Sequence, residues 1–239
     1  MPTLVLLRHG RSTANTSGVL AGWTPGVNLD DHGRGQAVAV AERLRPVPLA
    51  AVVSSPLDRC RQTVEPLLAD RDGGPDAPVI DDRLGECRYG DWTGRKLTDL
   101  VKEPLWKVVQ QHPSAAVFPG PEGEGLATTQ ARAVAAVREW NARVEESAGK
   151  DAVWLACSHG DVIKAILADA YGMHLDLFQR IVVDPCSVSV IRYSETRPFV
   201  VRVNDIGGDL TGLLPPPKPA GNEAEVDASD AVVGGGAGA

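Results

Sequence analysis

Thr3-Leu-Val-Leu-Leu-Arg-His-Gly10 is the stretch of the sequence that decides the fold. Its first five residues form a continuous run that favours β-structure, which is typical of a strand buried on both faces of a parallel sheet. The run ends at a polar Arg-His-Gly turn. Because ligands bind outside the carboxyl ends of the strands in open α/β sheets, Arg8 and His9 are candidates for a functional site.

The chain beyond this strand alternates strand and helix patterns. Strands are predicted over residues 3–7, 50–54, 79–80, 152–157, 187–192 and 198–204, and helices over residues 31–45, 56–69, 98–111, 128–146 and 160–171. The second helix is expected to begin with Ser55 as its N-cap and Pro56 in its first turn. The alternation predicts an α/β fold, a three-layer α/β/α sandwich with a mostly parallel central sheet whose last two strands close one edge.

Composition separates a folded body from a C-terminal tail. Residues 1–210 suit one catalytic domain, since their length and apolar segments allow one sizeable core. From Leu214 the sequence turns to Pro, Ala, Gly and acidic residues and ends in Val233-Gly-Gly-Gly-Ala-Gly-Ala239. Such a segment buries too little apolar surface to offset its ordering entropy, so residues 211–239 are predicted to be a disordered tail.

The overall charge restricts the partners. A formal net charge of -7 and a pI near 5.2 argue against nucleic acid and anionic lipid, because both would repel the chain. No segment approaches the roughly 20 apolar residues that span a membrane, and the opening apolar run is too short for a signal peptide. The four cysteines form neither a C-x-x-C pair nor a zinc-binding spacing, which favours a reduced compartment. We therefore expect a cytoplasmic protein that binds neither nucleic acid nor membrane.

A second histidine has the same placement as His9. His159 follows the predicted strand over residues 152–157, and Arg59 follows the predicted strand over residues 50–54. A lone histidine beside a glycine is more often a turn or packing residue than a catalyst. Three strand ends that bring arginine and histidine to one crevice instead predict a site that selects an anion.

At these positions the sequence closely resembles the histidine phosphatase superfamily, also called phosphoglycerate mutase-like. The matching motifs are Leu7-Arg-His-Gly-Arg-Ser-Thr-Ala-Asn15, Ser54-Ser-Pro-Leu-Asp-Arg-Cys-Arg-Gln-Thr63, Leu84-Gly-Glu-Cys-Arg-Tyr-Gly-Asp-Trp-Thr-Gly94, Pro119-Gly-Pro-Glu-Gly-Glu124 and Cys157-Ser-His-Gly160. They follow the family's order over roughly residues 1–205, and ordered motifs in strand-turn-helix context are far more specific than single ones. The resemblance implies a phosphoglycerate mutase-like fold and a phosphoryl-transfer enzyme.

The resemblance also implies roles for individual residues. The implied catalytic residues are His9, Glu86 and His159. The implied ligands of the substrate phosphate are Arg8, Arg59, His159 and Asn15. His9 is the implied nucleophile, and Glu86 the implied proton donor to the leaving group. Without the surrounding motif Glu86 would be taken for a solvated loop acid, and Asn15 is as readily an ordinary turn or capping residue.

Elementary chemistry agrees with these roles. Phosphate monoesters repel anionic nucleophiles, so catalysis depends on positioning and on stabilising the equatorial oxygens, a task that arginine forks suit. Neighbouring arginines also lower the pKa of His9 and so favour its neutral, nucleophilic form. A phosphohistidine on His9 divides hydrolysis into two steps and requires neither metal nor cofactor.

The segment after Glu86 favours a phosphatase over a glycolytic mutase. Residues 87–96 are compact and lack the basic and aromatic insertion with which such mutases grip a second phosphate. We therefore predict metal-independent hydrolysis of a small phosphorylated metabolite. Arg88, Arg95 and Lys96 could still form a second anion site, so a phosphomutase stays the alternative.

Two alternatives of other classes stay open. A metallohydrolase could use His9, His159 and Asp161, although no H-E-x-x-H or similar ligand pair is present. A catalytically inactive module that binds phospho-ligands would be expected to lack Glu86 or one of the two histidines. The resemblance leaves a homodimer open, and no residue supports it.

Overall fold

A six-stranded mixed sheet forms the centre of the molecule. The structure, a computed structural model, describes residues 1–69, 74–208 and 233–236. The strands lie in the order β3-β2-β4-β1-β5-β6 and are β1 Thr3–Arg8, β2 Leu49–Ser54, β3 Val79–Ile80, β4 Val153–Ser158, β5 Val188–Tyr193 and β6 Pro198–Asp205. Strands β3, β2, β4 and β1 are parallel to one another, whereas β5 runs antiparallel to β1 and β6 antiparallel to β5. The predicted sheet, with two closing strands at one edge, is confirmed.

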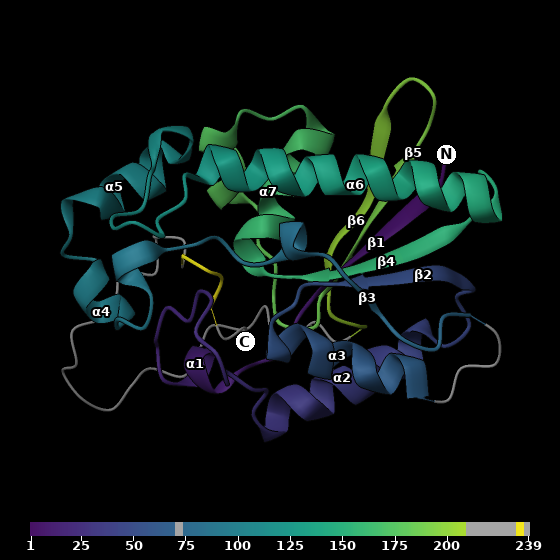
Figure 1. Ribbon diagram of the computed structural model, residues 1–239, viewed down its shortest axis with the longest axis horizontal. Helices are drawn as coiled ribbons and strands as arrows, with labels where there is room; N and C mark the ends of the chain where they lie inside the picture. Colours follow the sequence, from purple (N-terminus) through teal and green to yellow (C-terminus); the bar gives the residue numbers. More distant parts are fainter. Residues whose placement is uncertain (70–73, 209–232, 237–239) are drawn as a thin grey trace.

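Helices cover both faces of this sheet. Leu4 and Leu6 of β1 pack into one core cluster with residues of α6 and α7, and Val5 and Leu7 pack into a second cluster with residues of α2 and α3. Alternate side chains of a strand point to opposite faces, so β1 is buried on both. The covering helices are α2 Asp31–Leu44, α3 Asp58–Ala69, α6 Leu126–Ala148 and α7 Gly160–Tyr171. Figure 1 shows the two pairs on opposite sides of the sheet, which confirms the three-layer sandwich.

Short elements surround the carboxyl ends of the parallel strands. They are α1 Thr13–Thr16, α4 Leu97–Leu100, α5 Pro104–Gln111 and the 3-10 helices η1 Asp82–Leu84, η2 Gly90–Trp92, η3 Pro113–Ala115 and η4 Leu175–Arg180. The single helix predicted over residues 98–111 is wrong, because the chain breaks between α4 and α5. Glu103 is extended, with φ -75° and ψ 139°, as the residue before a proline prefers, and Pro104 then opens α5.

The start of α3 also differs from the prediction. The helix begins at Asp58, whose carboxylate lies in the first turn and suits the positive end of the helix dipole. Ser55 was expected to be the N-cap, but its hydroxyl lies 2.7 Å from Nε2 of His159 and accepts only a long hydrogen bond, 3.3 Å, from the amide of Leu57. Ser55 therefore belongs to the functional site and not to the helix cap.

Most of the predicted tail lies outside the described residues. For residues 211–232 and 237–239 the prediction of disorder stays a prediction. Residues 233–236 are described, and there the structure differs, since Val233 is only 1% exposed and belongs to the first core cluster. Composition alone missed these contacts, because backbone hydrogen bonds of the glycines supply much of what holds the segment.

Within the three described ranges, no helix has the length and apolar character needed to cross a membrane. The four cysteines, Cys60, Cys87, Cys157 and Cys186, are all buried and carry free thiols.

Candidate active site

The register of two strands brings the two histidines side by side. Arg8 of β1 pairs with Ser158 of β4, and the amide of His9 donates to the carbonyl of Ser158 over 3.0 Å. The rings of His9 and His159 lie 5.2 Å apart between centroids, tilted by 58°. From the next strand, β2, the chain passes into α3 and supplies Arg59, whose Nε lies 3.3 Å from Nε2 of His9. The three strand ends singled out in the sequence thus meet in one crevice.

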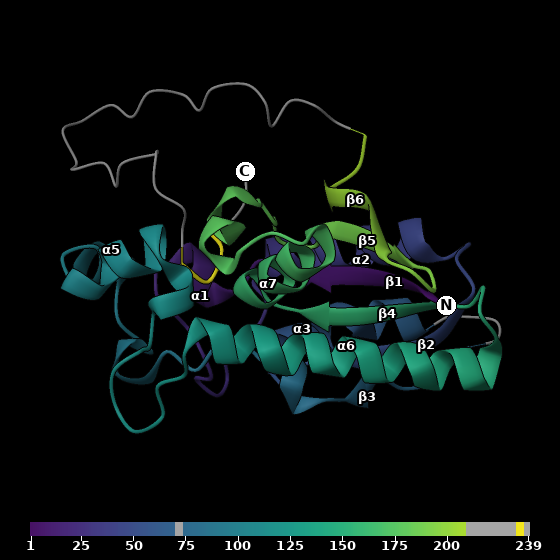
Figure 2. The same cartoon turned by 90° about the horizontal axis from the view of Figure 1, so that it is seen from above.

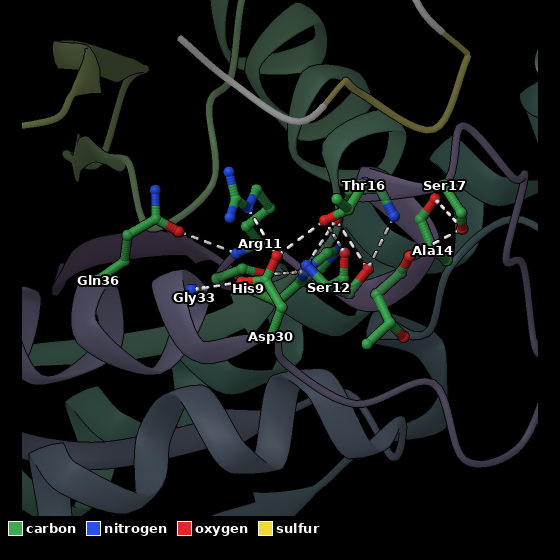
Figure 3. A network of polar contacts seen from close by, with 12 residues as sticks. His9, Arg11, Ser12, Ala14, Thr16, Ser17, Asp30, Gly33 and Gln36 are labelled. Carbon is green, nitrogen blue, oxygen red and sulfur yellow. Dashed lines mark hydrogen bonds and ion pairs between the residues drawn. The ribbon is translucent and has the colours of Figure 1, made fainter.

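Helix caps hold the turn that follows β1 (Figure 3). Ser12 caps α1 through its hydroxyl, and the side-chain oxygen of Asn15 accepts in return from the amide of Ser12 over 3.0 Å. Asp30 caps α2 by accepting from the amide of Gly33 over 2.7 Å and also pairs with Nε of Arg11 at 2.7 Å. The caps of α1 and α2 therefore both hold the turn that follows β1.

His9 is held in one tautomer. Its Nδ1 lies 2.7 Å from the carbonyl of Gly10, and because a carbonyl can only accept, Nδ1 carries the proton. Nε2 then has a free lone pair, which accepts from Nε of Arg59. Burial and the charges of Arg59 and Arg8 lower the pKa of His9 well below its usual value, so the ring is neutral near pH 7. The arrangement leaves Nε2 of His9 as a neutral nitrogen with its lone pair directed to Arg59.

Arg8 and Arg59 carry buried positive charge without a carboxylate partner. Each is at most 2% exposed, and none of the ion pairs among the described residues includes either one. They donate to backbone carbonyls instead. Nη1 of Arg8 donates to the carbonyl of Val183 at 2.7 Å, and Nη2 of Arg59 donates to the carbonyl of Gly22 at 3.0 Å. Two desolvated guanidinium groups beside His9 make this a strong anion site.

His159 is fully buried behind His9. Besides the hydroxyl of Ser55, the thiol of Cys60 lies 3.5 Å from its Nε2. Burial, followed by the charge of Arg59, lowers the pKa of His159 well below its usual value. Ser55 and Cys60 were missed as site residues, because serine and cysteine at a strand-to-helix junction carry no distinctive sequence signal.

Glu86 lines the same pocket as His9 and Arg59 and is only 3% exposed, so it is not a solvated loop acid. Burial, and then the charge of Asp161, raises the pKa of Glu86 to about 7. Its backbone carbonyl accepts from Nε1 of Trp23 at 2.6 Å and from Nη2 of Arg132 at 3.0 Å. Its carboxyl group accepts through Oε1 from the amide of Cys87 at 2.9 Å. A carboxyl group with a pKa near neutral pH suits both donation and acceptance of a proton.

Asn15 has the capping role, and its position as a phosphate ligand stays a prediction. Its side-chain oxygen closes the capping box of α1, while its amide nitrogen reaches into the pocket and lies 3.5 Å from the carbonyl of Gly235. One end of the amide is therefore structural, and the other is available to a ligand.

A buried polar cluster around Asp161 was not foreseen. Oδ2 of Asp161 accepts from the hydroxyl of Tyr89 at 2.8 Å and from the amide of Gly234 at 2.9 Å, and Nζ of Lys164 lies 3.6 Å from Oδ1. Oδ1 itself has no hydrogen-bond partner among the described residues. Asp161 had been considered only as a metal ligand, and in the described part of the chain no three His, Cys, Asp or Glu side chains gather as a metal-binding group.

Comparisons with known proteins agree with the fold. Residues 4–206 match the model of the histidine phosphatase superfamily (branch 1). The chain is 32% identical over 189 residues to 2,3-bisphosphoglycerate-dependent phosphoglycerate mutase 2 of Gloeobacter violaceus, covering 78% of this chain and 83% of the relative. It is also 32% identical over 175 residues to glucosyl-3-phosphoglycerate phosphatase of Mycolicibacterium vanbaalenii, covering 72% and 76%. Among solved structures, Bacillus stearothermophilus YhfR matches with a TM-score of 0.75 at 27% identity, over 87% of this chain and 98% of that one.

The elevated pKa of Glu86 makes a prediction for stability. Its carboxyl group titrates near 7 in the folded chain and near 4.5 when exposed, so between these values the folded state keeps a proton that the unfolded state has lost. The free energy of unfolding of the wild type should therefore fall relative to Glu86→Gln as the pH rises from about 4.5 to 7, by on the order of 3 kcal/mol. Urea unfolding at a series of pH values measures this difference.

Glu122→Gln is the matched control, because it removes a carboxylate whose side chain is 78% exposed. A difference between wild type and Glu86→Gln that stays constant across this pH range would contradict the buried, proton-retaining Glu86.

Proposed function

This chain belongs to the histidine phosphatase superfamily, and we propose that it hydrolyses a small phosphomonoester through a covalent phosphate on His9. Its relatives include phosphatases and phosphoglycerate mutases, and it is an enzyme of the phosphatase or phosphomutase type, which sets the inactive binding module aside. The observation that carries the finer proposal is the neutral Nε2 of His9, held beside two guanidinium groups that lack carboxylate partners.

In the first step Nε2 of His9 attacks phosphorus and the bond to the leaving oxygen breaks. Arg8 and Arg59 bind the phosphoryl oxygens, and Arg59 transfers its hydrogen bond from Nε2 to the phosphate as the lone pair engages. Glu86 gives its proton to the leaving alkoxide. The ring becomes cationic when it carries the phosphate, and the carbonyl of Gly10 on Nδ1 stabilises that charge.

In the second step water attacks the phosphohistidine. Glu86, now a carboxylate, takes a proton from that water, the bond between phosphorus and Nε2 breaks, and inorganic phosphate leaves. His9 returns to its neutral form and Glu86 to its acid form, so the cycle closes with no net change in the enzyme. A carboxyl group with a pKa of about 7 is suited to alternate between the two roles.

The side chains after Glu86 favour the phosphatase over the mutase. Nη2 of Arg95 pairs with Glu103 at 2.6 Å, and Arg88 lies over the ring of Trp23 and 3.6 Å from Glu122. Two of the three cations considered for a second phosphate are therefore already paired with carboxylates, whereas Lys96 is exposed and has no ion pair among the described residues. A small phosphorylated metabolite is accordingly the proposed substrate, and a cytoplasmic location stays a prediction.

We expect the full chain to release inorganic phosphate from some members of a panel of small phosphomonoesters and 3-phosphoglycerate in the presence of a chelator. His9→Ala should abolish that release, because it removes the nucleophile, whereas His32→Ala, an exposed histidine on α2, should not. Phosphate release is followed colorimetrically. Isomerised phosphoglycerate without free phosphate would establish the phosphomutase instead, and activity lost to the chelator would favour the metallohydrolase.

The role of Glu86 depends on the leaving group. Glu86→Gln should lower kcat/KM by ~10²- to 10⁴-fold for an alkyl phosphomonoester, whose alkoxide needs a proton. It should lower kcat/KM much less for a nitrophenyl phosphate, because a nitrophenolate leaves without a proton. The comparison uses kcat/KM because this constant reports only the steps up to phosphorylation of the enzyme. Equal losses for the two substrates would refute Glu86 as the proton donor, and Glu122→Gln again serves as the control.

A further inference from the structure

A segment of four residues near the C-terminus, Val233–Gly236, lies inside the proposed catalytic pocket. The short yellow segment in Figures 1 and 2 lies beyond the carboxyl ends of β1 and β4, between α1 and α7. The pocket lining that includes His9, Arg59 and Glu86 also includes these four residues. Residues 206–232 separate the segment from the last strand, so its presence there is a specific contact and not a continuation of the fold.

The segment occupies the anion-binding edge of Arg8. The carbonyls of Gly235 and Gly236 each accept from Nη2 of Arg8 at 2.7 Å, and the amide of Asn15 lies 3.5 Å from the first of them. Nη2 has only two hydrogens, so both are taken. A phosphoryl oxygen cannot bind Nη2 of Arg8 while these two carbonyl oxygens remain, and among the described residues Nε of Arg8 is left without a hydrogen-bond partner.

Two further anchors hold the segment. Val233 is only 1% exposed in the core cluster that also contains Leu20 and Tyr89. The amide of Gly234 donates to Asp161 at 2.9 Å, on the oxygen that also accepts from Tyr89. An apolar anchor, one amide donor and two carbonyl acceptors together define a binding site for a short peptide.

The sequence of the segment fits this site at each glycine. Gly234 and Gly235 have φ of 77° and 69°, in the left-handed region where side chains are unfavourable. A Cβ at position 235 would lie 2.9 Å from Cζ of Arg8, and one at position 234 would lie 3.0 Å from Cδ1 of Leu20. A side chain at either position would therefore be strained in its backbone and would require a neighbouring side chain to shift.

Little room is left once the segment is in place. The remaining cavity is about 30 Å³, far below the ~300–1,000 Å³ of typical ligand pockets. A phosphomonoester can enter only after the segment has withdrawn.

We propose that Val233–Gly236 is an intramolecular competitor that binds the phosphoryl site through Arg8, Asn15 and Asp161 and that substrate must displace. This proposal rests on the proposed function, because it takes Arg8 and Asn15 as ligands of the substrate phosphate. The apparent affinity for phosphate is then the intrinsic affinity reduced by the fraction of molecules whose segment has withdrawn.

The first test measures the binding of inorganic phosphate to the full chain by calorimetry. Gly235→Ala places a methyl group against the guanidinium of Arg8 in a strained backbone conformation and should expel the segment, so it should bind phosphate several-fold more tightly than wild type. Gly208→Ala is the matched control, because a Cβ there has nothing within 4 Å, and it should bind like wild type. Equal affinities in all three proteins would overturn the proposal while leaving the phosphoryl site intact. Phosphate binding to none of them would overturn both.

The second test separates competition from a catalytic role of the segment. Val233→Asp should also expel the segment, because a carboxylate would replace a side chain buried in an apolar cluster. Both Val233→Asp and Gly235→Ala should lower KM several-fold at unchanged kcat. A fall in kcat with either variant would mean that the segment assists the reaction, and would contradict a competitor.

Discussion

The hydrogen bond from Nδ1 of His9 to the carbonyl of Gly10 is the interaction on which the proposed chemistry depends. It fixes the tautomer, so that the nitrogen facing Arg59 carries the lone pair and not the proton. The parallel register of β1 and β4 and the caps on α1 and α2 hold this turn in position. A proton moved to Nε2 would leave every residue of the site present and the nucleophile absent.

The site is costly to maintain because it gathers charge away from water. Arg8 and Arg59 are buried, satisfied in part by backbone carbonyls and unpaired by any carboxylate within the described residues. Burial and these two charges lower the pKa of His9, and the two unpaired guanidinium groups favour binding of an anion. In our account the carbonyls of Gly235 and Gly236 accept hydrogen bonds from Arg8 when no substrate is present. The guanidinium group proposed to bind phosphate therefore also binds the segment Val233–Gly236.

Sequence reasoning succeeded where local pattern and motif agreed. The strand ending at Arg8 and the helix over residues 160–171 were predicted closely, because apolar runs bounded by Gly, Pro and polar turns leave few alternatives. It failed where contacts between residues far apart in sequence determine the role of a side chain. Ser55 contacts His159 instead of capping α3, and Asp161 and Val233 also contact residues that are distant in sequence. Composition predicts how a tail behaves on average, and it cannot show that four of its residues match a particular pocket.

Direct detection of the phosphoenzyme tests the central claim. Wild-type protein is mixed with a phosphomonoester that it hydrolyses, and the reaction is quenched within the first turnovers in alkali, in which phosphohistidine is stable. After digestion, mass spectrometry identifies the modified residue and ³¹P NMR the modified nitrogen. We predict phosphate on Nε2 of His9, formed and lost at rates compatible with turnover. Phosphate on another residue or on Nδ1, or turnover with no phosphoenzyme, would contradict the account.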